Sequence, residues 1–125
     1  MTLITLRFAS DMEEAVLTGK KCCTTRMEKK YEDTKKVIPP HKIGDRFCVK
    51  GRLYEIVGYQ RRVIQDVYVS YLSLEGFRDK PDDPAGKQFE RFFSEVMGIP
   101  REQWGKPCHV YFFAYAGFGL NGEES

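Results

Sequence analysis

The chain contains no long hydrophobic run. None of its 125 residues belongs to a stretch approaching the roughly 18 consecutive apolar residues that a membrane-spanning helix needs. The first residues also lack the long apolar segment and small-residue cleavage site of a secretory signal. From these absences we expect a cytoplasmic protein with no membrane partner.

Cysteine is sparse and is not spaced as in a metal or redox site. The four cysteines are Cys22, Cys23, Cys48 and Cys108. Zinc and redox sites usually separate paired cysteines by two or more residues, whereas Cys22 and Cys23 are adjacent. The other two lie in apolar segments, where cysteine behaves as a small buried hydrophobe. We therefore expect free thiols, no metal and no cofactor, with structural zinc as the weaker alternative.

A glycine-rich phosphate loop is missing as well. The segment "LTGKKCCTTR" at residues 17–26 combines lysines and threonines with a single glycine, Gly19. A phosphate cradle needs several glycines so that the backbone can approach the anion. Gly19 stands instead where a helix would end in a left-handed cap.

The composition that remains is typical of one globular domain. A charged fraction of 30% and a hydrophobic fraction of 42% differ from those of disordered or fibrous chains. We expect a single domain at 1–118 and a disordered tail at 119–125. Residues 1–62 hold 14 Lys/Arg against 8 Asp/Glu, and residues 63–125 hold 6 against 10. This uneven charge permits a basic face that attracts phosphate.

The hydrophobic pattern predicts an α+β fold. We predict strands at 2–8 and 107–117, a β-hairpin at 43–64, helices at 10–19 and 87–98, a short helix within 65–77 that ends near Glu75 and Gly76, and a surface loop at 28–42. Ser10 and Glu13 have the spacing of a capping box, and Lys50-Gly51 marks the hairpin turn. Because the strands are closely spaced, we expect a small, mainly antiparallel sheet or barrel flanked by two or three helices.

The chemistry of "LTGKKCCTTR" is carried by Lys21, Thr24 and Arg26. On a straight strand Lys21 and Thr24 would face opposite sides, while Thr24 and Arg26 would share one. A threonine hydroxyl is a weak nucleophile unless a neighbour takes its proton, and a lysine does so only if its pKa falls well below about 10.4. On local sequence alone, an exposed cationic strand is the simpler interpretation.

Several short motifs, in order along the chain, resemble the ASCH domain family. "EAVLTGKKCCTTR" resembles its amino-terminal signature, a helix followed by Leu-x-Gly-[Arg/Lys]-Lys-x-x-Thr-x-Arg. "KIGDRFCVKG" resembles the Gly-Asp strand that opens the barrel, "LEGF" at 74–77 the Glu-Gly-Phe element, and "VYFFAY" the closing strand. The resemblance covers roughly residues 3–115.

The resemblance implies a PUA-like fold: a small β-barrel with a cleft beside the first helix, in a superfamily associated with RNA. Some small bacterial members of the family hydrolyse 4-acetylcytidine with a Lys, a Thr and a Glu. These positions match Lys21 as base or activator, Thr24 as nucleophile and Glu75 as proton relay or orienting carboxylate. The chain departs from the pattern at Cys22, where many members have threonine, and in an extra segment at 80–99.

Two functions follow from the resemblance. The first is recognition of RNA or a modified nucleoside in the cleft by a protein expected to be a monomer. Its candidate ligand-binding residues are Lys20, Arg26, Lys29, Lys30, Tyr31 and Tyr71. The alternative is a metal-independent amidohydrolase that deacylates 4-acetylcytidine-type nucleosides with Lys21, Thr24 and Glu75. Ribonuclease activity is a weaker third possibility, because His41 and His109 do not suggest an acid-base pair.

Overall fold

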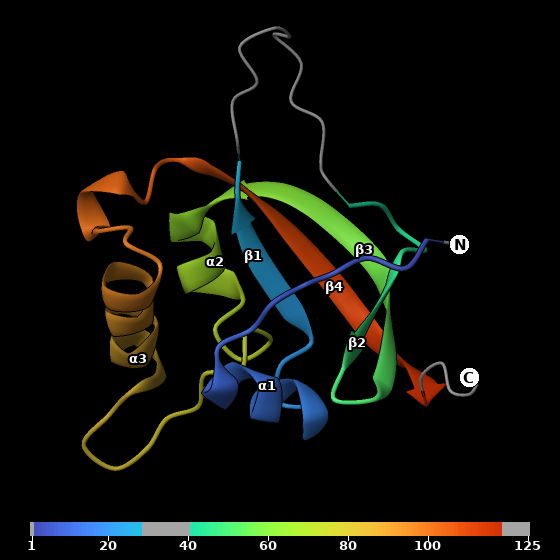
Figure 1. The fold of residues 1–125 in the computed structure, drawn as a ribbon. Coiled ribbons are helices and arrows are strands. Elements are labelled where there is room, and N and C mark those ends of the chain that lie inside the picture. Colours follow the sequence, from blue (N-terminus) through green and yellow to red (C-terminus); the bar gives the residue numbers. More distant parts are fainter. Residues whose placement is uncertain (1, 29–40, 119–125) are drawn as a thin grey trace, which may run out of the picture.

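The computed structural model describes residues 2–28 and 41–118, which form an α+β fold around one antiparallel sheet (Figure 1). Its elements are α1 (Ser10–Leu17), β1 (Cys23–Met27), β2 (Arg46–Val49), β3 (Arg52–Val63), α2 (Ile64–Ser70), α3 (Ala85–Arg91), the π-helical turn η1 (Phe92–Val96), the 3-10 turn η2 (Arg101–Gln103) and β4 (Pro107–Phe118). The predicted fold class, a mainly antiparallel sheet with helices beside it, is confirmed.

The sheet has the strand order β1-β4-β3-β2, and each pair of neighbours is antiparallel. The predicted hairpin is confirmed, since β2 and β3 are joined by Lys50 (φ 47°) and Gly51 (φ 82°). Two left-handed residues in succession are typical of the turn that suits twisted hairpins. Two register shifts, one between Leu53 and Tyr54 and one between Ile56 and Gly58, interrupt the β3–β4 ladder. Because such bulges increase local twist, the long strands curl into a half-barrel (Figure 1).

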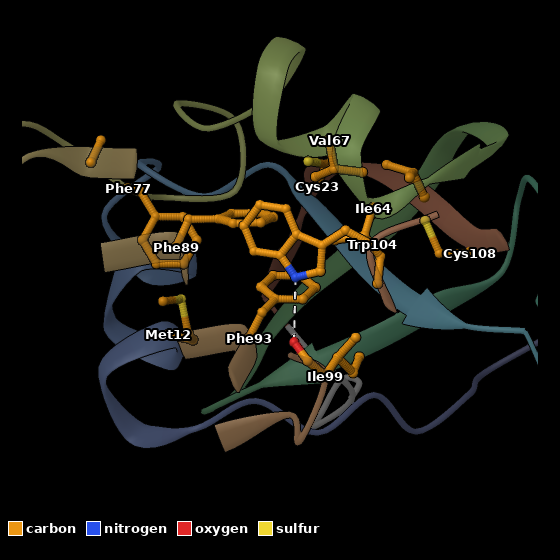
Figure 2. Close-up of a cluster of buried hydrophobic side chains, with 12 residues drawn as sticks. Met12, Cys23, Ile64, Val67, Phe77, Phe89, Phe93, Ile99, Trp104 and Cys108 are labelled. Carbon is orange, nitrogen blue, oxygen red and sulfur yellow. Dashed lines mark hydrogen bonds between the residues drawn. The ribbon is translucent and has the colours of Figure 1, made fainter. Parts of the chain in front are cut away.

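One hydrophobic cluster packs α2, α3 and η1 against the sheet, and we call it the helix cluster (Figure 2). It consists of Met12, Cys23, Ile64, Val67, Phe77, Ala85, Phe89, Phe93, Ile99, Trp104, Cys108 and Val110. The rings of Phe89 and Phe93 are stacked with centroids 4.2 Å apart. The Trp104 indole donates a hydrogen bond to the Ile99 carbonyl at 3.3 Å. Burial of each such ring contributes about 1.5–3 kcal/mol, which holds α3 and η1 to the sheet.

A second cluster, the barrel cluster, fills the inside of the curled sheet. It consists of Leu6, Val16, Phe47, Val49, Tyr54, Ile56, Tyr111 and Phe113. Helix α1 contributes to both clusters, because its Met12 belongs to the helix cluster and its Val16 to the barrel cluster. Phe8, which precedes α1, packs against both. The boundary between the two clusters therefore lies at Phe8 and α1.

Helix α1 begins without the predicted capping box. Its N-cap is Ala9, in an extended conformation and with no side-chain cap, so Ser10 is already helical. The capping-box prediction for Ser10 and Glu13 is wrong because the chain turns into the helix one residue earlier, where the Ala9 carbonyl accepts the N–H of Glu13 at 2.8 Å. At the other end, Gly19 has a φ of 79°, which confirms the predicted left-handed cap.

The strand predicted at 2–8 is wrong as a continuous element. Only Leu3 forms a bridge, a parallel one, with Arg46 of β2. The Arg46 backbone donates to the Thr2 carbonyl at 2.8 Å and accepts the N–H of Ile4 at 2.7 Å. Beyond that point the chain leaves the sheet edge to reach α1, and it buries Leu6 in the barrel cluster. The alternating hydrophobic pattern therefore reflects burial of single side chains and not a ladder.

The remaining helix predictions hold with changed boundaries. The helix within 65–77 is shorter than predicted, because α2 ends at Ser70 and residues 72–76 form turns and a bridge that include Glu75. The helix predicted at 87–98 is confirmed as α3 with η1, and Gly98 (φ 70°) ends it. Most of the loop predicted at 28–42, and the tail predicted at 119–125, lie outside the described residues. No helix within 2–28 or 41–118 has the length and apolar character needed to cross a membrane.

Gly76 allows the turn after α2 to approach the chain just beyond α1. Its φ is 101°, and a Cβ at this position would lie 3.1 Å from the Cβ of Lys21 and 3.3 Å from the Cβ of Ala15. Both the positive φ and the lack of space require glycine here. The close approach puts the preceding residue, Glu75, beside Lys21.

We predict that Gly76→Ala lowers the free energy of unfolding by about 1–3 kcal/mol, the usual cost of a strained backbone conformation. Gly105→Ala is the matched control, because a Cβ there meets nothing within 4 Å, and it should have little effect. Urea unfolding followed by circular dichroism measures both variants. Equal stabilities would contradict the steric requirement at Gly76.

Candidate functional site

Backbone hydrogen bonds fix Lys21 beside Glu75, which is 54 residues away along the chain. The two residues form an isolated antiparallel bridge. The N–H of Lys21 donates to the Ala15 carbonyl of α1 at 2.9 Å, and the N–H of Cys22 donates to the Leu74 carbonyl at 2.7 Å. The main chain therefore holds the start of β1 against both α1 and the turn that carries Glu75.

The side chains of Lys21 and Glu75 form a buried ion pair. Lys21 Nζ lies 2.7 Å from Glu75 Oε1 and 3.1 Å from the Glu75 carbonyl oxygen. The two side chains are 5% and 4% exposed, respectively. Removing two charges from water costs several kcal/mol per ion, which their attraction repays only with good geometry and further hydrogen bonds. The structure thus brings together two of the three residues that the resemblance predicts as catalytic.

The second carboxylate oxygen of Glu75 is held by β1. Thr25 Oγ1 donates to Glu75 Oε2 at 2.5 Å, and Cys23 Sγ lies 3.5 Å from the same oxygen. Both side chains are buried. Burial, reinforced by the charge of Glu75, raises the pKa of the Cys23 thiol far above its usual range, so this sulfur stays protonated. Three side chains therefore surround one carboxylate.

Thr25 and Cys23 are absent from the site predicted from sequence. The signal that could have identified them is the strand alternation, because residues 21, 23 and 25 recur with a period of two and share one side of an extended chain. The sequence motif draws attention to Thr24 instead. The alternation identifies Cys23 and Thr25 as site residues only once the structure shows that Glu75 lies on the same side of the strand.

Thr24 has a different set of contacts. Its hydroxyl accepts a hydrogen bond from Arg26 Nε at 3.1 Å, which confirms that the two residues share a face. Another guanidinium nitrogen of Arg26 donates to the Arg7 carbonyl at 2.9 Å, and the group lies 5.1 Å from the Phe8 ring centre. Burial lowers the pKa of Arg26, although a guanidinium keeps its charge in proteins. Within the described residues, no hydrogen bond joins Thr24 to Lys21 or Glu75.

With the exception of Cys23, these polar groups line one cavity of about 130 Å³. Its polar side chains are Arg7, Lys21, Thr24, Thr25, Arg26 and Glu75. Its apolar wall consists of Phe8, Ala9, Met12, Phe92, Phe93, Val96 and Met97. The cavity lies at the boundary between the helix and barrel clusters, and η1 forms part of its wall. Thr24 thus shares the cavity with Lys21 and Glu75, without a hydrogen bond to either.

The other predicted binding residues are not gathered here. Lys20 is exposed and lines a wider groove of about 520 Å³ between α1 and α3. Tyr71 donates its hydroxyl to the Gln60 side chain at 2.6 Å and packs against the helix cluster. Of the predicted ligand-binding residues that the structure describes, namely Lys20, Arg26 and Tyr71, Arg26 is therefore the one that lines the cavity. Lys29, Lys30 and Tyr31 lie outside the described residues.

The two histidines, His41 and His109, make their contacts with tyrosines and do not line the cavity of the ion pair. The hydroxyl of Tyr59 and His109 Nδ1 are 2.7 Å apart, and the ring of His41 packs edge-on against Tyr111 with centroids 5.4 Å apart. Neither histidine lines the cavity. Among the residues described, no three His, Cys, Asp or Glu side chains are grouped so that they could hold a metal ion.

The burial of the ion pair predicts an asymmetric response to mutation. Lys21→Met should lower the free energy of unfolding by about 3–5 kcal/mol, because it leaves the Glu75 carboxylate buried without its counter-charge. The double variant Lys21→Met with Glu75→Leu removes both charges and should recover most of this loss. Chemical denaturation of the two variants and the parent measures the difference. A double variant less stable than Lys21→Met would contradict this account.

Comparisons with known proteins support the fold. No protein-family model matches the sequence, and no curated protein matches it. Three solved structures do match the described fold. An ASCH domain from Lactobacillus crispatus JV V101 has a TM-score of 0.57 at 16% identity, over 91% of this chain and 78% of that one.

The other two solved structures also match the fold at low sequence identity. A DUF984 protein from Enterococcus faecalis V583 has a TM-score of 0.57 at 17% identity, over 87% of this chain and 72% of that one. A mutant of the ASCH protein from Zymomonas mobilis has a TM-score of 0.51 at 12% identity, over 90% of this chain and 66% of that one. Identities this low establish a shared architecture. The chain therefore has the fold of an ASCH domain, as its sequence motifs predicted.

Proposed function

We propose that this protein recognises a modified pyrimidine nucleoside and takes its base into the cavity beside Lys21 and Glu75. The observation that carries the proposal is the cavity itself, about 130 Å³ with a charged inner side and an apolar wall. This space corresponds to roughly four water molecules at about 30 Å³ each. It suits one planar base or acyl group and is too small for a nucleic-acid helix.

The lining of the cavity supports a ligand with both polar and apolar edges. Lys21 and Arg26 supply donors to the cavity, and Glu75 supplies acceptors. Phe8 and Phe92 offer aromatic surface in the same lining, and the Phe8 ring lies 5.1 Å from the Arg26 guanidinium. Buried bases are generally recognised by hydrogen bonds to their edges together with stacking on aromatic side chains. The same arrangement would accept the base of a free nucleoside or of a single nucleotide turned out of an RNA strand.

We predict that N4-acetylcytidine raises the melting temperature of the protein more than cytidine does. Ala9→Phe should abolish the shift, because Ala9 is exposed and lines the cavity, so that a ring there narrows the entrance. Val69→Phe is the matched control, since Val69 is 71% exposed and lies outside the cavity. Differential scanning fluorimetry with both nucleosides and a short single-stranded RNA measures the effect. A shift that persists in Ala9→Phe would contradict binding in this cavity.

A second candidate function, hydrolysis of the acyl amide of an N4-acylated cytidine, is favoured by the buried ion pair. Amide hydrolysis needs a nucleophile, a group that accepts its proton and a group that protonates the leaving nitrogen. Threonine hydroxyls, the Glu75 carboxylate and the Lys21 ammonium provide these groups in one cavity. Binding alone requires no charge pair as deeply buried as this one, whose desolvation is costly. The resemblance to the ASCH amidohydrolases supports the same reaction.

We predict that the protein releases acetate and cytidine from N4-acetylcytidine. Glu75→Gln and Lys21→Met should each reduce kcat/KM by roughly 10²-fold or more, because each removes a proton-transfer group. Lys106→Met is the matched control, since Lys106 is exposed, does not line the cavity and lies in the bend just before β4. Chromatographic separation of the two nucleosides measures turnover. Full turnover by Glu75→Gln would contradict the hydrolytic role, while nucleoside binding could still be observed by fluorimetry.

A further inference from the structure

We propose that Thr25, and not Thr24, is the nucleophile of this cavity and that Glu75 is the base that deprotonates it. The inference rests on the hydrolytic function proposed above and assigns its reacting hydroxyl. It concerns a residue that the sequence motif does not single out. The geometry of β1 and of the Glu75 carboxylate points to this assignment.

The register of β1 separates the two threonines. Thr24 is opposite Tyr111 of β4, whereas Thr25 is opposite Val110. Tyr111 belongs to the barrel cluster and Val110 to the helix cluster. Since directly opposed residues share a face of the sheet, Thr24 lies on the barrel side and Thr25 on the helix side. Glu75 reaches the helix side, where its carboxylate contacts Thr25.

Activation of a hydroxyl as a nucleophile requires a hydrogen-bond partner that can accept its proton, and only one of the two threonine hydroxyls has such a partner among the described contacts. The Thr25 hydroxyl donates to a carboxylate oxygen at 2.5 Å, and a carboxylate can accept its proton. The Thr24 hydroxyl accepts from the guanidinium of Arg26 at 3.1 Å. A guanidinium has no acceptor, so this contact cannot remove the proton of Thr24. It makes Thr24 and Arg26 suited to holding a substrate oxygen instead.

Cys23 contacts the same carboxylate oxygen but is a poor competitor. Its Sγ lies 3.5 Å from Glu75 Oε2, and the residue does not line the cavity. Burial raises the pKa of its thiol, which removes the thiolate that would react. Thr25 therefore combines two features that Cys23 does not: a close base and access to the cavity.

The reaction balances with the groups present. Thr25 Oγ1 forms a bond to the acyl carbonyl carbon while its proton passes to Glu75 Oε2. The carbon–nitrogen bond then breaks, and the leaving amino group takes a proton from the Lys21 ammonium. Lys21, now a neutral amine, recovers a proton from the Glu75 carboxylic acid once the carboxyl group has turned its protonated oxygen to the position that Oε1 holds, 2.7 Å from Lys21 Nζ. Water next attacks the acyl-threonine ester and gives its proton to Glu75, which passes it to the departing Thr25 oxygen. The net change is amide and water to amine and carboxylic acid.

The test uses 4-nitrophenyl acetate as an acylating probe beside N4-acetylcytidine. We expect rapid-quench tandem mass spectrometry to locate one acetyl group on Thr25. Thr25→Val should lose the adduct and reduce nucleoside turnover by roughly 10²-fold or more, while Thr25→Ser should retain both. Thr24→Val should keep the adduct on Thr25 with a raised KM. Thr5→Val is the matched control for the substitution, because Thr5 is exposed and outside the cavity.

The outcomes separate this inference from the proposed function. An acetyl group on Thr24, or full turnover by folded Thr25→Val, overturns the assignment while hydrolysis stands. An adduct on Thr25 without release of cytidine supports the nucleophile and contradicts the nucleoside as substrate. Absence of any adduct on Thr25 with both acyl donors overturns the inference.

Discussion

The buried ion pair between Lys21 and Glu75 is the interaction on which the candidate site depends. It joins two points 54 residues apart, and it forms because main-chain hydrogen bonds and Gly76 bring the turn after α2 against the start of β1. A carboxylate without partners at 3% exposure would be strongly unfavourable. The contacts of Lys21 and Thr25 with its two oxygens therefore stabilise the fold. They also determine which groups can exchange a proton with the carboxylate.

The cavity exists because two hydrophobic clusters meet without filling the space between them. The helix cluster holds η1 in place, and the barrel cluster closes the curled sheet, with α1 and Phe8 contributing to both sides. A π-helical turn is uncommon and is frequently found at functional sites. Here its residues Phe92 and Val96 form part of the apolar lining of the cavity. The segment at 80–99 thus shapes the space that a ligand would occupy.

Much of the site could be predicted from the order of residues in the motifs, but the threonine that contacts Glu75 could not. Lys21 and Glu75 come together as the ASCH resemblance implies. Which threonine meets the carboxylate depends on the side from which Glu75 approaches β1, a property of packing between distant segments. Lys20 and Tyr71 were plausible ligands by charge and aromaticity, yet tertiary contacts direct them to a separate groove and to Gln60.

The sequence by itself determined the elements that depend on local chemistry. The hairpin turn at Lys50-Gly51, the cap at Gly19 and the periodic helix ending at Gly98 follow from backbone preferences within a few residues. Tertiary structure alone decided that residues 2–8 do not form a strand, since a ladder requires a partner along its whole length. It also decided the cavity and the pairing of Thr25 with Glu75. These features depend on how segments separated by tens of residues pack together, and a local sequence pattern does not specify contacts between such segments.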